Sequence, residues 1–169
     1  TNLLPCDEMY PFLRSSLSEY YESFMKSNSN VLLLIGPPGT GKTTFIRGML
    51  SHTGSSAMVT YDASILEKDF VFANFIEQSV DLLVLEDSDN FLKARSEGNT
   101  MMHRFLNVGD GLVTTKGKKL IFSTNLPSVR DVDEALIRPG RCFDILKFEQ
   151  LTNEQAQILA EKQGFDLNE

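Results

Sequence analysis

The sequence predicts an α/β domain of three layers, with helices on both faces of a central, mostly parallel sheet of five strands. Short, continuous apolar segments alternate along the chain with segments whose apolar residues recur at helical spacing. Strands that alternate with helices pair in parallel, because each helix carries the chain back across the sheet. A glycine-rich turn between the first apolar segment and the next helical segment is a second indication of this architecture.

The expected strands are short and apolar. They are Val31–Ile35, Ala57–Tyr61, Leu82–Leu85, Leu120–Phe122 and Phe143–Phe148. Val31–Ile35 and Leu82–Leu85 are apolar throughout, which is typical of strands that are buried on both faces of a sheet. Both should therefore lie in the interior of the sheet.

The expected helices show apolar residues three or four positions apart. Such spacing occurs in residues 13–24, 43–49, 71–76, 101–106 and from 158 onward. Ser64 with Glu67, and Thr152 with Gln155, fit the capping-box pattern that begins a helix.

The composition is that of a soluble globular domain with one core, since 41% of the 169 residues are hydrophobic and 23% are charged. A net charge of −7 argues against broad binding to nucleic acid or anionic membrane. No apolar run reaches the ~18 residues of a membrane span, so the expected location is cytoplasmic. The chain begins at Thr1 rather than Met, and we expect flanking regions to be missing.

The cysteines and histidines are too isolated to suggest a metal site. Cys6 and Cys142 lie far apart, as do His52 and His103. We expect two buried free thiols and no structural zinc.

The strongest chemical signal is a glycine-rich turn after the first expected strand. It reads Gly36-Pro37-Pro38-Gly39-Thr40-Gly41-Lys42-Thr43, followed by Thr44. The pattern G-x-x-x-x-G-K-[ST] between a strand and a helix folds so that backbone N–H groups point at phosphate oxygens. The helix N-terminus adds partial positive charge, Lys42 reaches the β- and γ-phosphates, and the Thr43 hydroxyl ligates Mg²⁺. The turn therefore predicts binding of a nucleoside triphosphate with Mg²⁺.

Polar side chains also follow two later strands. Glu86 and Asp87 come directly after Leu82–Leu85, at the sheet edge where open α/β proteins bind ligands. One carboxylate can bind the Mg²⁺ shell while the other polarises an attacking water. Asn125 follows Leu120–Phe122, and its amide can bond both the γ-phosphate and that water.

Two arginines flank a Pro-Gly turn in the segment Ala135–Arg141. Arg138 and Arg141 are thereby held on a stiff turn, and a guanidinium fork suits a phosphate. The plainer interpretation is a pair of surface arginines.

The order of these four motifs resembles that of the AAA ATPases, in which they are named Walker A, Walker B, sensor 1 and arginine fingers. The resemblance spans about Val31 to Phe148, and Ala135–Arg141 is similar to the family signature A-L-x-R-P-G-R. It implies a P-loop NTPase core over residues 1–150 and the start of a truncated helical lid over 151–169. It further implies hydrolysis of ATP to ADP and phosphate, and a ring of six or seven subunits in which arginine fingers reach a neighbour's nucleotide.

One subgroup is more similar still: the Bcs-type AAA ATPases, the mitochondrial Rieske-protein translocases and their relatives. They resemble this chain in the order L-E-D-x-D, here ending in Glu86-Asp87-Ser88-Asp89, and in the F-L-N-x-x-D-G segment Phe105–Gly111. The subgroup implies that Glu86 binds Mg²⁺ with Thr43, that Asp87 activates water, and that the ring remodels or translocates a protein.

The interval from Tyr61 to Glu86 is short, as in that subgroup, and leaves little room for an aromatic-Gly pore loop. Phe70 and Phe72 could serve as such a loop, but we expect them to pack in the core from a helix, and we do not expect a classical threading unfoldase.

Two other functions share the nucleotide site. Lys116, Lys118 and Lys119 could form a phosphate-contacting patch in a nucleic-acid-directed ATPase, such as a helicase loader or clamp loader, or simply a solvated loop. A non-hydrolysing nucleotide switch would bind ATP without turnover.

Overall fold

The computed structural model describes residues 5–61, 74–75, 77–86, 88–92 and 118–164. Within these residues, five strands form one sheet in the order β2-β3-β4-β1-β5, and every neighbouring pair is parallel. The strands are β1 (Val31–Ile35), β2 (Ala57–Thr60), β3 (Leu82–Leu85), β4 (Lys119–Thr124) and β5 (Cys142–Lys147). This arrangement confirms the predicted α/β fold, with a sheet that is entirely parallel.

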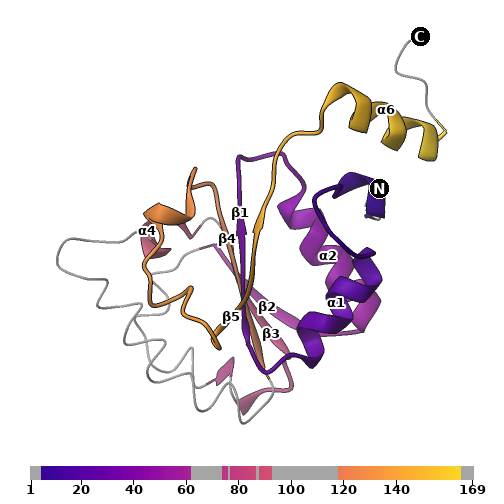
Figure 1. Ribbon diagram of the computed structural model, residues 1–169. Coiled ribbons are helices and arrows are strands. Elements are labelled where there is room, and N and C mark those ends of the chain that lie inside the picture. The colour runs from indigo at the N-terminus through magenta and orange to yellow at the C-terminus, as the bar shows by residue number, and fades with distance from the viewer. Residues whose placement is uncertain (1–4, 62–73, 76, 87, 93–117, 165–169) are drawn as a thin grey trace.

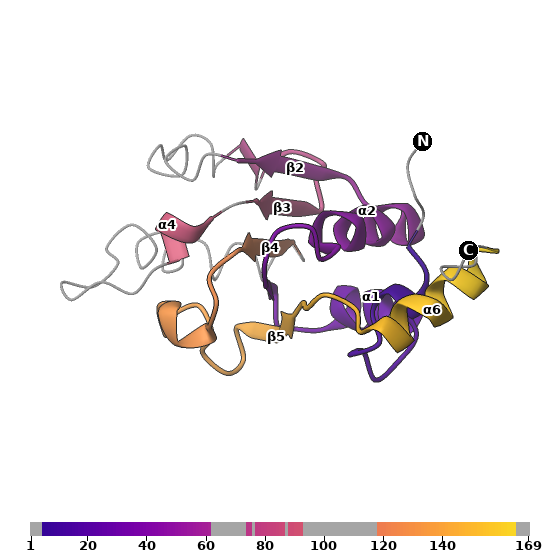
Figure 2. The ribbon, with the colours of Figure 1, turned by 90° about the horizontal axis from the view of Figure 1, so that it is seen from above.

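The described helices are η1 (Asp7–Met9), α1 (Leu17–Lys26), α2 (Lys42–Thr53), α4 (Asp89–Leu92), η3 (Val129–Asp131) and α6 (Asn153–Lys162). Two views show α1 and α2 together on one side of the sheet and α4 on the other (Figures 1 and 2). The capping box predicted for the last helix is confirmed, because Thr152 and Gln155 exchange side-chain and backbone hydrogen bonds. Leu13 lies outside the first helix, which begins at Leu17 because the Ser16 side chain accepts from the N–H of Glu19.

The sheet is buried on both faces, and β1 divides its side chains between two cores. Val31, Leu33 and Ile35 belong to one core, which also contains Phe75 and residues of the segment 126–136. Leu32 and Leu34 belong to the other, which α1 and α2 cover. This alternation is the period of two that a strand imposes on its side chains.

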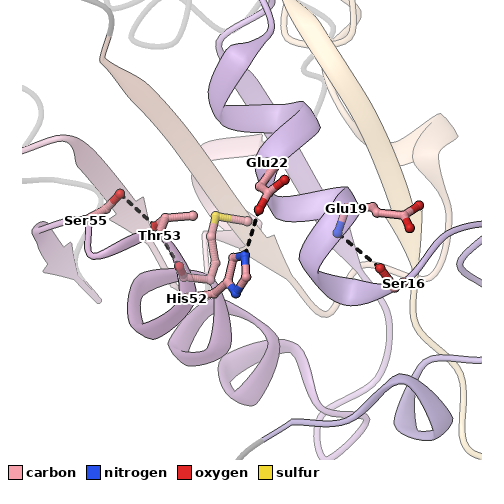
Figure 3. A network of polar contacts seen from close by, with 7 residues as sticks. Ser16, Glu19, Glu22, His52, Thr53 and Ser55 are labelled. Atoms are coloured by element: carbon pink, nitrogen blue, oxygen red, sulfur yellow. Dashed lines mark hydrogen bonds and ion pairs between the residues drawn. The ribbon is translucent and has the colours of Figure 1, made fainter.

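Helices α1 and α2 are joined by polar contacts at their surface and by close packing beneath it. Figure 3 shows His52 on α2 beside Glu22 on α1, with 3.2 Å between Nε2 and Oε1. The Tyr21 hydroxyl donates to the carbonyl of Phe45 at 2.8 Å. At Gly48 a Cβ would lie 2.3 Å from Cγ of Pro5 and 2.6 Å from the Tyr21 oxygen, so the missing side chain allows the N-terminal segment to pack on α2.

Lys118 and Lys119 do not form a surface patch. Lys118 is 7% exposed, and its Nζ donates to the carbonyls of Gln78 and Val80. Lys119 is 2% exposed, and its Nζ donates to the Ser27 carbonyl at 2.5 Å; burial lowers the pKa of Lys119 to about 8. Both expectations for these two lysines, a phosphate-contacting patch and a solvated loop, are therefore wrong, because backbone carbonyls hold both ammonium groups inside.

Some of the other sequence predictions can be compared with the described residues, and some fall outside them. Cys6 and Cys142 are free thiols, as predicted, but both are half-buried. The capping box at Ser64, the helix around residues 101–106, Lys116, the pair Phe70 and Phe72, and the segment Phe105–Gly111 lie outside the described residues. Among the residues that the structure describes, no helix has the length and apolar character needed to cross a membrane.

Candidate functional site

An open cavity of about 580 Å³ lies at the carboxyl edge of the sheet. Its lining includes the turn at residues 38–44, Glu86 after β3 and Asn125 after β4. Three of the four predicted motifs thus meet in one place, because the carboxyl ends of parallel strands share an edge.

The turn has the backbone form that a phosphate cradle needs. Gly41 adopts a left-handed φ of +96° and is the N-cap of α2, so the chain turns directly into the helix. A side chain here would be strained in this conformation, and a Cβ would lie 3.2 Å from the ring of Tyr10. The N-terminus of α2 therefore lies at the cavity, and the free N–H groups of its first turn can stabilise an anion there.

Lys42 is buried to 7% exposure at the mouth of this turn. Its Nζ donates to the carbonyl of Gly36 at 2.5 Å and to that of Pro37 at 2.8 Å. It also donates to Oδ1 of Asn125 at 3.1 Å, which connects the turn with the end of β4. These three acceptors are neutral, and a phosphate oxygen would be a stronger partner than any of them.

Thr43 and Glu86, next to Lys42 in the cavity lining, place a hydroxyl oxygen and a carboxylate side by side. The Thr43 hydroxyl lies 3.2 and 3.3 Å from the two carboxylate oxygens of Glu86, which is 9% exposed. Hydroxyl and carboxylate oxygens are the ligands that Mg²⁺ takes beside substrate phosphates. The donor set therefore fits a magnesium ion. Asp87, the predicted water-activating residue, lies outside the described residues.

The ends of β3 and β4 are joined by two residues that the sequence analysis did not assign to the site. The N–H and the hydroxyl of Ser88 both donate to the Ser123 carbonyl, at 3.0 and 2.9 Å. Oδ1 of Asp89 accepts from the Thr124 hydroxyl at 2.7 Å and from the N–H of Asn125 at 3.0 Å. The only sequence signal for this arrangement is a further acid two positions after the Glu86-Asp87 pair.

The apolar end of the cavity was also missed. Met9 and Tyr10 line it from the N-terminal segment, and Leu151 and Leu159 from the C-terminal one. The Tyr10 hydroxyl donates to the Gly41 carbonyl at 3.0 Å, and burial raises the pKa of Tyr10 far above its usual value. The hydroxyl therefore stays protonated and tethers the N-terminal segment to the turn.

Arg138 and Arg141 lie at the opposite edge of the sheet. The carbonyl of Arg141 accepts from the N–H of Val31 at 3.0 Å, at the start of β1. The turn follows the end of β1, roughly 15 Å away at the usual rise of a strand. The guanidinium of Arg141 donates to the Ala135 carbonyl, whereas Arg138 is exposed. The structure therefore does not bring these arginines to the turn of the same chain.

In this parallel sheet the first strand leads through a glycine-rich, lysine-bearing turn into a helix. An acid follows β3 and an amide follows β4. This combination defines the P-loop nucleoside triphosphatases. Comparison with known families gives the particular branch. The chain belongs to the AAA family, the ATPase family associated with various cellular activities, whose model matches residues 32–150. Membership of this family implies ATP binding and ATPase activity.

The chain is also similar to several curated proteins. It is 29% identical over 147 residues to the 26S proteasome regulatory subunit 8 homolog of Saccharomyces cerevisiae, covering 77% of this chain and 36% of that protein. It is 31% identical over 162 residues to the homolog from Schizosaccharomyces pombe, covering 83% and 39%. For the 26S proteasome regulatory subunit 8 of Caenorhabditis elegans the identity is 30% over 149 residues, covering 77% and 35%. The chain thus spans less than half the length of these relatives.

Proposed function

We propose that this chain binds ATP with Mg²⁺, hydrolyses it to ADP and phosphate, and does so as one subunit of a ring that remodels or translocates a protein. The observation that carries the proposal is the division of the phosphate-binding groups between two edges of the sheet. Lys42, Thr43 and Asn125 meet at the carboxyl edge, whereas Arg138 and Arg141 lie at the amino edge. A site of this kind is completed by the arginines of a neighbour.

The cavity suggests how the nucleotide is placed. The turn from Gly36 to Thr44 would bind the phosphates through its N–H groups, and Lys42 would exchange its carbonyl partners for phosphate oxygens. Thr43 and Glu86 would hold Mg²⁺, which neutralises charge on the β- and γ-phosphates when bound. The base would lie at the apolar end formed by Tyr10 and Leu159.

For the hydrolytic step we assign Asp87 to the activation of water and Asn125 to its orientation. The described site supports the second assignment, since Asn125 lines the cavity within hydrogen-bonding distance of Lys42. Arg138 and Arg141 would stabilise the transition state in the neighbouring subunit, where an arginine in trans adds about 10³–10⁵ in rate.

The division into a core at residues 1–150 and the beginning of a lid at 151–169 is part of the same proposal. Leu159 of α6 lines the cavity. The ammonium of Lys162 lies 3.8 Å from the Glu8 carboxylate on η1. These two contacts support the proposal that α6 begins a lid over the apolar end of the cavity, beside the N-terminal segment.

Kinship gives further support to the assembly and is the basis for proposing a protein substrate. The relatives are named as regulatory subunits of the 26S proteasome, that is, as parts of a larger assembly. The Bcs-type subgroup is proposed from sequence motifs alone, such as the order Glu86-Asp87-Ser88-Asp89, since the relatives reported above are named as proteasome subunits. A nucleic-acid partner is less well supported, because Lys118 and Lys119 are engaged by backbone carbonyls.

The subgroup can be examined separately by exchanging the two acids, with Glu86→Asp and Asp87→Glu combined. This double variant has the acid order of ordinary AAA domains. If the Bcs-type order is built into the site, the exchange lowers turnover, because each carboxylate then lies one methylene from its working position. Unchanged turnover would contradict the subgroup and leave the ATPase proposal standing.

The function is tested by complementation between two inactive variants. Lys42→Ala should lose nucleotide binding but keep its arginines, and the double variant Arg138→Ala with Arg141→Ala should bind nucleotide without a finger. We expect each to release little phosphate from ATP alone and a mixture to recover turnover. The matched control replaces the exposed Arg130 by Ala and should be as active as the unaltered chain.

Turnover per subunit that rises with protein concentration in the unaltered chain would support assembly as well. Binding of ATP with no turnover at any concentration would instead support the nucleotide switch. No binding at all would contradict the proposal.

A further inference from the structure

The end of β4 is fixed from outside the cavity by the short segment that follows β3. Ser88 donates twice to the Ser123 carbonyl, through its N–H and its hydroxyl. Asp89 receives the next two donors along β4, the Thr124 hydroxyl and the Asn125 N–H, on a single carboxylate oxygen. Residues 123–125, at the end of β4 and just after it, are therefore hydrogen-bonded to Ser88 and Asp89, at the beginning of α4.

These bonds fix the peptide unit from which the Asn125 side chain leaves the backbone. Thr124 is fully buried at 0% exposure, so its hydroxyl depends on a protein acceptor. The Thr124 hydroxyl accepts in turn from the N–H of Leu126 at 3.1 Å, which ties down the residue on the far side of Asn125. With both flanking residues held, the Asn125 amide has little freedom except rotation about its own side-chain bonds.

The network continues from Asn125 into the turn. Oδ1 of Asn125 accepts from Nζ of Lys42, and that ammonium bonds the carbonyls of Gly36 and Pro37. A path of hydrogen bonds therefore runs from the Asp89 carboxylate through Asn125 to Lys42. Asp89 does not line the cavity, as far as the described residues show. Its influence on the site has to pass through the groups that it holds.

We propose that Asp89 is a positioning residue for hydrolysis. It holds the Asn125 amide in the position from which that amide can hydrogen-bond the γ-phosphate and the attacking water. The inference rests on the proposed function, because turnover is the quantity that positioning changes. Groups in a catalytic site must be held within about 0.5 Å by the bonds that support them. A misplacement of about 1 Å can lower a rate about a hundredfold.

The alternative is that Asp89 only stabilises α4, since an acid in the first turn of a helix is favourable. That role predicts a lower unfolding temperature and no specific effect on turnover. The two roles are separated by comparing kcat with the Kd for ATP, and by using variants that keep or remove the acceptor oxygen.

The experiment uses the unaltered chain with Asp89→Ala, Asp89→Asn, Thr124→Val and Thr124→Ser. Asp89→Ala should lower kcat by about tenfold or more while the Kd for ATP changes less than about twofold. Asp89→Asn keeps an acceptor oxygen and should recover much of kcat. Thr124→Val should behave like Asp89→Ala and Thr124→Ser like the unaltered chain. The exposed Asp131, replaced by Asn, is the matched control and should change nothing.

A second readout does not depend on turnover. The backbone N–H of Asn125 bonds a carboxylate, so its proton resonance should lie downfield in a ¹H–¹⁵N spectrum. We expect it to move upfield and to exchange faster with solvent in Asp89→Ala, and to stay close to its original position in Asp89→Asn. An unaltered Asn125 resonance in Asp89→Ala would overturn the positioning role, as would an unaltered kcat. If the resonance moves but the unaltered chain never hydrolyses ATP, the proposed function fails while the hold of Asp89 on Asn125 stands.

Discussion

Nζ of Lys42 lies 3.1 Å from Oδ1 of Asn125, although 83 residues separate the two in the sequence. The contact follows from the sheet: β1 and β4 are adjacent and parallel, with Ile35 paired to Thr124, so the residues after both strands meet at one edge. It gives Lys42 a neutral partner that a phosphate can replace. It also places Asn125 within reach of the group that the lysine binds.

Replacing Lys42 by Ala should weaken ATP binding by about a hundredfold or more. The ammonium would lose hydrogen bonds to both the β- and the γ-phosphate, each worth about 1.5–3 kcal/mol as a bond to a charged group, and each 1.4 kcal/mol is tenfold in Kd. The Kd for a fluorescent ATP analogue measures the loss. The exposed Lys26, replaced by Ala, is the control and should leave the Kd unchanged. Equal affinity in the two variants would contradict the assignment of the turn.

The strands were largely predictable from the sequence because a strand buried on both faces is an uninterrupted apolar run. Leu82–Leu85 has the same bounds in the structure. β4 is longer than predicted, from Lys119 to Thr124, because its polar ends are buried against hydrogen-bond partners. The rule that lysine lies at the surface fails for Lys119, because the carbonyls that accept hydrogen bonds from its ammonium are brought to it only by the fold.

The two arginines should differ in their effect on stability. The guanidinium of Arg141 donates to the Ala135 carbonyl within its own loop, whereas Arg138 is exposed without a side-chain partner among the described residues. Arg138→Ala should therefore slow turnover at an unchanged unfolding temperature. Arg141→Ala should slow turnover and lower that temperature as well, by about 2–4 °C for each kcal/mol lost. Calorimetry and phosphate release on both variants check this. A drop in unfolding temperature for Arg138→Ala would show that the Arg138 side chain stabilises its own chain, and would contradict this prediction.

The apolar end of the cavity could not be read from the sequence. Met9 and Tyr10 lie on and just after a helix of three residues, which has no periodicity to detect. Tyr10 reaches the turn because the N-terminal segment packs on α2, where Gly48 leaves room for Pro5. The motif residues could be proposed from the sequence because phosphate chemistry requires fixed residue types at fixed spacing. The residues that complete the cavity were missed because tertiary packing alone selects them.

Replacing Gly48 by Ala should destabilise the chain, although Ala favours a helix by about 1 kcal/mol over Gly. The added Cβ would lie 2.3 Å from Pro5 and 2.6 Å from the Tyr21 hydroxyl, and overpacking of this kind costs about 1–3 kcal/mol. Urea unfolding measures the net effect, with Ser51→Ala on the exposed side of the same helix as control. Because Pro5 precedes Met9 and Tyr10, ATP affinity should also fall. A stabilised Gly48→Ala variant would show that the N-terminal segment does not press on α2.

Lys119 should make stability depend on pH in the alkaline range. Its pKa in the folded chain is about 8, below the ordinary value of 10.5, because burial disfavours the charged form. Between these two values the unfolded chain binds more protons than the folded one, so this group adds to the free energy of unfolding as the pH rises from about 8 toward 10.5. Cys142 acts in the opposite sense above pH 9, since burial raises its pKa to about 11.

Comparison with Lys119→Met removes the contribution of every other group. The difference in unfolding free energy between the unaltered chain and this variant should grow in favour of the unaltered chain between pH 8 and 10, as measured by urea titration. Replacing the exposed Lys26 by Met should give a difference that does not change with pH in this way. A difference for Lys119→Met that stays constant would mean that the ammonium is as well solvated in the fold as in water, and that the carbonyls of Ser27 and Ser29 compensate fully for its burial.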